Sequence, residues 1–145
     1  MLNAIFFYRI SRWLFLHHVP ILPKVITLFI FLIYNSKIPY QAKIGYGTRF
    51  GYGGVGVIIH SKAEIGEKCM IGQQVTVGGD NSRYPGVPII GNNVYIAKGA
   101  IVFGGITIGD NAIIGANAVV NKPVPANAVV AGVPAKILKI NDVDH

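Results

Sequence analysis

Few side chains in this chain are suited to acid–base chemistry near neutral pH, and His60 is the best placed of them. Of the four histidines, His17 and His18 fall in an apolar N-terminal stretch and His145 is the last residue. His60 instead follows a glycine-rich interruption, residues 51–56, of a regular repeat. Function is often carried at such interruptions, and imidazole suits general acid or base work. We interpret His60 as the candidate general base; the plain alternative is a repeat residue that faces solvent.

Two tyrosines are further catalytic candidates. Tyr52 lies inside the 51–56 interruption, and Tyr84 lies in a polar stretch, residues 79–89, that interrupts the repeat a second time. Tyrosine, with an ordinary pKa of ~10, is a poor base at neutral pH, but it can orient a substrate hydroxyl or stack on a sugar. Either residue could equally be an ordinary loop aromatic. No metal-ligand cluster, nucleophile elbow, phosphate loop or CxxC motif is present, so we expect no bound metal.

The element that must position these residues is a six-residue repeat. The repeat unit is an aliphatic residue followed by a small residue; Val102 and Val120 keep the six-residue period but lack the glycine. A period this short is typical of a parallel β-helix built from hexapeptides, in which the aliphatic residue points inward and the small residue turns a corner. We therefore expect an all-β fold over residues 37–122. The repeat is an aliphatic residue followed by Gly or Ala, at Ile44-Gly45, Ile65-Gly66, Ile71-Gly72, Val77-Gly78, Ile90-Gly91, Ile96-Ala97, Ile108-Gly109 and Ile114-Gly115.

The N-terminal segment, residues 1–36, differs from the repeats. Apolar residues recur at near-helical spacing up to Trp13, Pro20 and Pro23 then break the pattern, and a second apolar run covers residues 25–34. Ten residues cannot cross the ~30 Å hydrocarbon layer of a bilayer. We expect a helical hairpin that packs on the β-helix or on a neighbouring subunit and caps one end. Peripheral membrane contact through this segment is a second interpretation. Residues 123–145 are expected to form a C-terminal turn and tail.

The charge pattern narrows the class of partner. The formal net charge is +7, but the lysines and arginines are scattered and not interleaved with aromatic residues. That pattern argues against nucleic acid and favours an acidic small ligand or a membrane surface. The single cysteine, Cys69, excludes a disulfide framework and is typical of a cytoplasmic protein. It falls at a repeat position that takes a small side chain, so we expect a packed thiol.

Four motifs, in order along residues 6–138, resemble the serine acetyltransferase family and the related acetyltransferases of capsule and O-antigen synthesis. Residues 8–14 resemble the helix that precedes their repeats, and residues 42–45 resemble their first repeat. Residues 75–79, which read VTVGG, and residues 131–137, which read AGVPAKI, resemble a central and a closing motif. The resemblance implies a left-handed parallel β-helix, a homotrimer, and acetyl-CoA as the donor.

In the family, coenzyme A lies in a groove between neighbouring β-helices and contacts the backbone of the later coils. Small residues let an extended ligand approach the backbone, and a lysine offers charge to a phosphate. Corner packing and a solvated lysine are the alternative interpretations. The resemblance assigns coenzyme A contacts to Gly78, Gly79, Ala97, Gly99, Ala116 and Lys136.

The chain departs from the family at its catalytic positions. The family's base histidine maps to Gly53 or Tyr52, its second histidine maps to Tyr84, and an aspartate that orients the base maps near Lys37. These departures put L-serine in doubt as the acceptor. We therefore expect an acetyl-CoA-dependent O-acetyltransferase that acts on a sugar hydroxyl in surface polysaccharide synthesis, in the cytoplasm or at the inner membrane face. Serine O-acetyltransferase and a catalytically silent scaffold are the alternatives.

Overall fold

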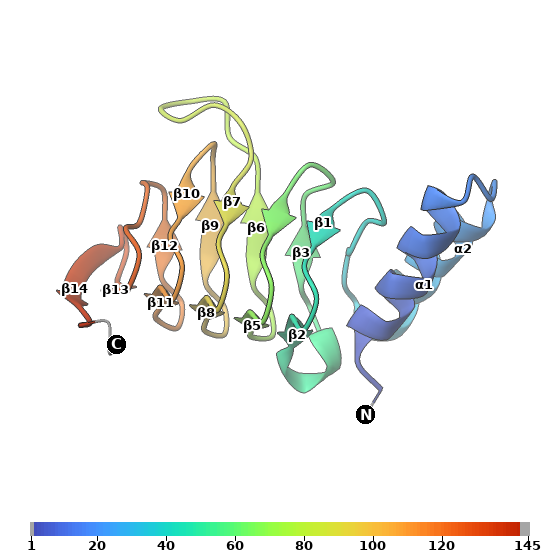
Figure 1. Cartoon of the computed structure of the whole chain (residues 1–145), viewed down its shortest axis with the longest axis horizontal. Coiled ribbons are helices and arrows are strands. Elements are labelled where there is room, and N and C mark those ends of the chain that lie inside the picture. The colour runs from blue at the N-terminus through green and yellow to red at the C-terminus, as the bar shows by residue number, and fades with distance from the viewer. Residues whose placement is uncertain (1, 143–145) are drawn as a thin grey trace.

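The six-residue repeat folds into a solenoid of four coils with three strands each (Figure 1), in a computed structural model that describes residues 2–142. The first coil holds β1 (Lys43–Ile44), β2 (Arg49–Phe50) and β3 (Ile58–Ile59), and the second holds β4 (Glu64–Ile65), β5 (Met70–Ile71) and β6 (Thr76–Gly78). The third holds β7 (Ile89–Ile90), β8 (Tyr95–Ile96) and β9 (Ile101–Phe103), and the fourth holds β10 (Thr107–Ile108), β11 (Ile113–Ile114) and β12 (Val119–Val120).

Equivalent strands of successive coils stack in parallel and form three sheets. The sheets follow the orders β1-β4-β7-β10, β2-β5-β8-β11 and β3-β6-β9-β12. The second sheet continues into β13 (Ala128–Ala131) and then β14 (Lys136–Ile140), which runs antiparallel to β13 and covers the last edge. The predicted parallel β-helix is confirmed.

The core consists of three columns of inward-facing aliphatic side chains, one for each sheet. Ile44 pairs in register with Ile65, and Ile71 pairs with Ile96, so each side chain lies directly on its counterpart in the next coil. These residues are nearly or fully buried. Burial of each large aliphatic side chain contributes roughly 1.5–3 kcal/mol, which is why the repeat demands an aliphatic residue every sixth position.

The glycine of the repeat has a steric cause. A Cβ at Gly45 would lie 2.6 Å from the backbone of Gly66, and one at Gly109 would lie 2.3 Å from the backbone of Ala126. A side chain at such a corner would therefore push neighbouring coils apart.

Two helices lie at the N-terminal end of the β-helix, and the predicted helical N-terminal segment is confirmed. They are α1 (Ala4–Leu16), whose N-cap Asn3 accepts from the Ile5 amide, and α2 (Leu22–Tyr34). Among residues 2–142, no helix has the length and hydropathy needed to cross a bilayer.

Helix α1 buries the side opposite to its most apolar stripe. Ala4, Tyr8 and Ser11 are fully buried, whereas Phe6 and Trp13 are at least half exposed. The reason is that no coil stacks before the first one, so the backbone N–H and C=O groups on that side of the first coil need hydrogen-bond partners from elsewhere.

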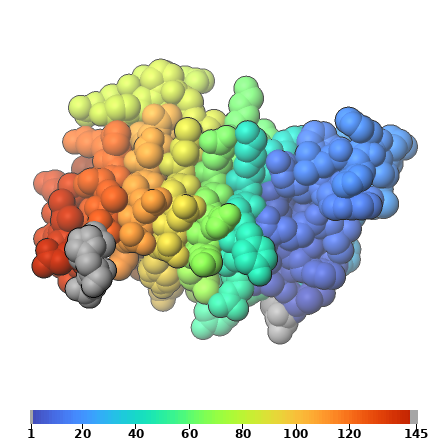
Figure 2. Space-filling model, in the orientation of Figure 1, coloured from blue at the N-terminus to red at the C-terminus, as the bar shows by residue number. Residues whose placement is uncertain are grey.

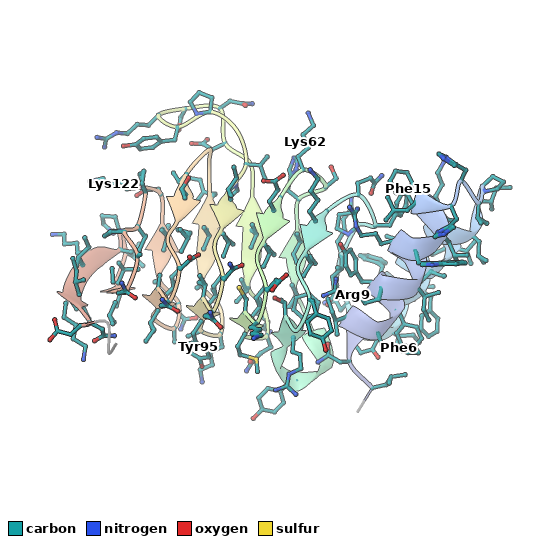
Figure 3. The ribbon with its side chains drawn as sticks, in the orientation of Figure 1. Phe6, Arg9, Phe15, Lys62, Tyr95 and Lys122 are labelled. Carbon is teal, nitrogen blue, oxygen red and sulfur yellow. The ribbon has the colours of Figure 1, made fainter. Side chains whose placement is uncertain are left out.

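The polar side chains of α1 supply the missing partners of the first coil. Tyr8 donates to the carbonyl of Ala42, Arg9 donates to the carbonyl of Ile44, and Arg12 donates to that of Tyr40 at 2.9 Å. Figure 3 shows Arg9 between α1 and this coil. The helix therefore acts as a cap for the N-terminal end of the solenoid.

Both interruptions of the repeat lie at corners of the solenoid. Residues 51–54 form the short 3-10 helix η1 (Gly51–Gly54) after β2. Residues 79–88 form a loop between β6 and β7, in which the backbones of Asp80 and Gly86 exchange hydrogen bonds of 3.0 and 2.8 Å. Figure 2 shows the loop, in yellow-green, standing out along one edge of the β-helix.

Candidate active site

A cavity lies between α2 and the first two coils, and we call it the α2 cleft. Its volume is about 520 Å³, which is within the range of small-molecule sites. Helix α2 supplies one wall, the chain segment that leads into the first coil supplies a second, and the ends of β3 and β6 supply the floor. The polar and small residues that line it include Lys24, Thr27, Lys37, Gln41, His60 and Gly78.

His60 stands at one end of the α2 cleft, directly after β3. The backbone N–H of Lys62 donates to His60 Nδ1 at 3.0 Å, which fixes the orientation of the ring. Its other face meets Gly79, where an ideal Cβ would lie 3.6 Å from His60 Nε2. Because the Lys62 amide can only donate, Nδ1 is an acceptor, and the proton of the neutral ring therefore sits on Nε2. Nε2 is thus the nitrogen free to act on a substrate.

His60 also borders a second cavity beneath the 79–88 loop, which we call the loop cavity. Its volume is about 410 Å³, and Gly79, Asp80 and Gly86 line it with His60. A hydrogen bond from Ser82 lowers the pKa of Asp80, so this carboxylate is ionised at neutral pH. His60 therefore lies between the α2 cleft, which has no carboxylate in its lining, and the loop cavity, which is lined by the carboxylate of Asp80.

Tyr84 is held in the loop but lines neither the α2 cleft nor the loop cavity. Its carbonyl accepts from the amide of Gly105 at 2.7 Å, and its side chain is half-buried against the core. The guanidinium of Arg83 lies 5.5 Å from the centre of its ring. Tyr84 as a catalytic residue stays a prediction.

Tyr52 lies in a third depression, which we call the lateral groove. Its volume is about 510 Å³, it crosses several coils, and its lining includes Tyr52, Tyr95, Ala97 and Ala116. The groove shares no lining residue with the α2 cleft or the loop cavity. Figure 3 shows Tyr95 at the edge of the β-helix opposite to Lys62, so one chain places the groove and the His60 corner apart.

The backbone of Tyr52 is left-handed, as it is at several other corners of the solenoid. The residue has φ 48° and ψ 42°, a left-handed conformation that a residue with a Cβ adopts at a cost of roughly 1–2 kcal/mol. Its side chain is 78% exposed, so packing within the chain does not offset the free-energy cost of that conformation. The same left-handed conformation recurs at Lys68, Gln74 and Asn93, so it belongs to the corners of the solenoid and does not by itself mark a functional surface.

The residues assigned to coenzyme A by resemblance fall into separate groups. Gly78 lines the α2 cleft and Gly79 the loop cavity, whereas Ala97 and Ala116 line the lateral groove. Lys136 lies near the C-terminal end, beside a smaller cavity of about 260 Å³.

Two of the assigned glycines differ in what surrounds them. A Cβ at Gly78 would have no neighbour closer than 3.8 Å, so nothing in the chain requires glycine there. Gly99 has φ +71°, and its Cβ would lie 2.0 Å from Asn117 Oδ1, so the fold alone explains it. Open space beside Gly78 is what a ligand that approaches the backbone needs.

Sequence reasoning missed the contribution of α2. Lys24 and Thr27 enter the cleft because α2 packs beside the first coil, and no local pattern predicts that angle. Gln73 and Tyr95 in the lateral groove were also missed. These two occupy outward positions of stacked coils, so a register built from the repeat would have found them.

His145 lies outside the described residues. Within residues 2–142 no three His, Cys, Asp or Glu side chains are arranged to hold a metal ion.

Residues 88–122 match the family model described as bacterial transferase hexapeptide, six repeats. These residues carry the six-residue repeat of that family. This hexapeptide-repeat chain is 32% identical to the serine acetyltransferase of Synechococcus elongatus over 99% of its length and 61% of the relative's. It is 36% identical to that of Mycobacterium tuberculosis over 94% of its length and 59% of the relative's. The predicted resemblance to serine acetyltransferases is confirmed.

Solved structures agree with these matches. The serine acetyltransferase of Brucella abortus in complex with coenzyme A superposes with a TM-score of 0.88 at 29% identity, over 97% of this hexapeptide-repeat chain and 56% of that one. A serine acetyltransferase in complex with cysteine gives 0.85 at 34% identity, over 95% and 54%. The chain thus spans about three fifths of those two curated relatives and about half of these solved chains.

Proposed function

We propose that this chain transfers an acetyl group from acetyl-CoA to a hydroxyl group of a small acceptor. The observation that carries the proposal is the match of nearly the whole chain to serine acetyltransferases, one of them solved with coenzyme A. The His60 corner supports it, since a ring nitrogen is free between two cavities and beside the open backbone of Gly78.

The names of the relatives favour L-serine as the acceptor over the sugar hydroxyl that the sequence suggested. A hydroxyl acceptor other than serine is the second candidate. The observation that favours it is Lys37, which lines the α2 cleft near the position where the family resemblance implies an aspartate.

The lateral groove is the candidate site for an extended ligand such as the pantetheine arm. Ala97 and Ala116 leave its floor low, and Lys98 adds a positive charge. Acetyl-CoA supplies an acetyl thioester, whose carbonyl carbon bonds to the acceptor oxygen as the carbon–sulfur bond breaks and coenzyme A leaves as the thiol. Since one chain keeps this groove apart from His60, we propose a homotrimer in which the groove of one copy meets the His60 corner of the next.

His60 would act through Nε2. The hydroxyl proton of the acceptor passes through solvent to the departing sulfur, so that coenzyme A leaves as the thiol, and the carbonyl oxygen gains negative charge in the tetrahedral intermediate. With its proton on Nε2, the neutral ring can donate to that oxygen or to the departing sulfur. The bond from the Lys62 amide holds this arrangement in place.

The proposal is tested by following release of the coenzyme A thiol from acetyl-CoA. The purified chain is incubated without acceptor, with L-serine, and with a panel of sugars and acidic sugars. Turnover with L-serine supports the first acceptor, and turnover with a sugar alone supports the second. His60→Ala should lose most of the activity, whereas His17→Ala, a change at the exposed residue that caps the C-terminus of α1, should keep it. An absence of both turnover and acetyl-CoA binding would overturn the proposal in favour of a silent scaffold.

A further inference from the structure

The α2 cleft carries positive charge that nothing in its lining neutralises. Lys24 enters from α2 and Lys37 from the segment before the first coil, and no Asp or Glu is among the lining residues. Within residues 2–142 the one ion pair joins Lys43 to Glu64, at 3.2 Å, so neither cleft lysine has a carboxylate partner there. Two unpaired ammonium groups on one cavity repel each other, and an anion bound between them removes that cost.

The surroundings of the cleft reinforce this charge. Residues 1–63 contain seven lysines and arginines and no aspartate or glutamate, whereas residues 64–145 contain six of each sign. The whole formal charge of +7 therefore resides in the part of the chain that builds three sides of the cleft. A concave site with a field of one sign concentrates ligands of the opposite sign.

The backbone at Lys37 is held in a defined place. Its N–H donates to the carbonyl of Val57 and its carbonyl accepts from the N–H of Ile59, both at 2.9 Å. These bonds attach the residue to β3, the strand that His60 directly follows. Lys24 lies one turn before Thr27 on α2, and both residues line the opposite wall. A group bound between the walls would thus meet a cation from each side.

We propose that the α2 cleft binds an anionic group of the acceptor, a carboxylate or a phosphate, between Lys24 and Lys37. This inference rests on the proposed function only in identifying the bound molecule as the acetyl acceptor. The anion site itself is a property of the cleft. With the anionic group held between the lysines, the rest of the acceptor extends over the exposed side of Ile58 toward His60 and Gly78.

The same cleft disfavours an ammonium group. L-serine carries a carboxylate that the lysines would bind, but its ammonium finds no carboxylate among the lining residues. An acidic hydroxyl compound without an amino group matches the charges better. We therefore expect hydroxy acids or sugar phosphates to bind more tightly than L-serine.

Binding is tested first with probes that do not depend on the identity of the acceptor. Inorganic phosphate, D-glucose 6-phosphate, uncharged D-glucose and L-serine are each titrated into the full chain while amide and ring signals are followed by NMR. We expect phosphate and the sugar phosphate to shift Lys24, Lys37 and His60, and glucose to shift none of them. Lys24→Gln with Lys37→Gln should weaken binding about tenfold, whereas Lys139→Gln, a change on β14 outside the cleft, should leave it unchanged.

The outcomes separate this inference from the proposed function. Lysine-dependent binding of phosphate supports the anion site even if no acetyl transfer is found. Acetyl transfer whose KM for the acceptor is unchanged in the double lysine variant would overturn the anion site and leave the activity standing. Phosphate shifts that spread over all surface lysines, or that persist in the double variant, would also overturn it. Lys37→Asp, which places the family's acidic residue in the cleft, should abolish phosphate binding.

Discussion

The backbone N–H of Lys62 donates to His60 Nδ1 at 3.0 Å, and this bond decides what the imidazole can do. A ring that accepts at Nδ1 carries its neutral-state proton on Nε2. We therefore predict that His60 serves acetyl transfer as a hydrogen-bond donor. Glutamine places an N–H near the position of Nε2, so His60→Gln should stay within about tenfold of the native rate. His60→Ala should lose about 10²-fold, as expected when one donor to an oxyanion is removed.

The matched control for this pair is His60→Asn. The asparagine amide oxygen can still accept from the Lys62 N–H, but the side chain places no atom at the position of His60 Nε2. The asparagine variant should therefore be as inactive as the alanine variant while keeping the native unfolding midpoint. Steady-state thiol release gives the rates. Equal loss in the glutamine and alanine variants would contradict the donor role and support a base.

The fold of the β-helix was predictable from the sequence because its determinants are local. Each inward aliphatic residue, such as Ile65 or Ile96, recurs at a fixed spacing and pairs with its counterpart one coil away. The orientation of α1 was not predictable in this way. Its buried face is chosen by the free carbonyls of the first coil, which Tyr8 and Arg9 satisfy, and the apolar stripe around Trp13 is left exposed.

The candidate site was predictable only in part for the same reason. His60 follows β3 and Gly78 ends β6, the equivalent strand of the next coil, so the repeat alone places them near each other. Lys24 joins them from a helix that precedes the solenoid, and its position depends on how α2 docks. The separation of Tyr52 from His60 also needed the structure, because it depends on which corner each interruption occupies.

Gly78 and Gly99 form a matched pair that separates ligand approach from packing. Gly78→Ala adds a methyl group that meets nothing closer than 3.8 Å within the chain. It should leave the unfolding midpoint unchanged and raise the KM for acetyl-CoA or the acceptor by about fivefold or more. Gly99→Ala should instead destabilise the fold by about 1 kcal/mol or more, because φ is +71° and Asn117 Oδ1 occupies the space. Denaturant unfolding and kinetics of both variants check this, and an unaltered KM in a folded Gly78→Ala would exclude close approach there.

Cys69 should be unreactive in the folded chain. The side chain is 2% exposed, burial raises the pKa of its thiol, and Sγ donates to the carbonyl of Gly91 at 3.1 Å. A thiol with a raised pKa stays protonated as the pH rises past the ordinary value, and the thiolate is the reactive form. We expect a disulfide reagent to detect no thiol in native protein between pH 7 and about 8.5, and one thiol for each chain in denaturant.

This protection matters for the activity assay, because the same reagents report the coenzyme A thiol. A native chain that reacted at once would show that Cys69 is accessible and would contradict its place in the core. Cys69→Ser, measured in parallel, should remove the signal in denaturant. It should also show that thiol release in the presence of acetyl-CoA comes from the donor alone.

Tyr8 offers the clearest test of the N-terminal cap. Its hydroxyl donates to the carbonyl of Ala42 and accepts from the N–H of Ile44 at 3.2 Å, and the side chain is fully buried. Both backbone groups point away from the second coil, so no strand can replace the hydroxyl. Tyr8→Phe should therefore lower the free energy of unfolding by about 1–3 kcal/mol, the cost of leaving buried polar groups unpaired. Urea unfolding measures the loss, and Tyr46→Phe, at a side chain that is 79% exposed, should change it by less than about 0.5 kcal/mol. Equal stability of the two variants would show that α1 does not pair with the edge of the first coil in solution.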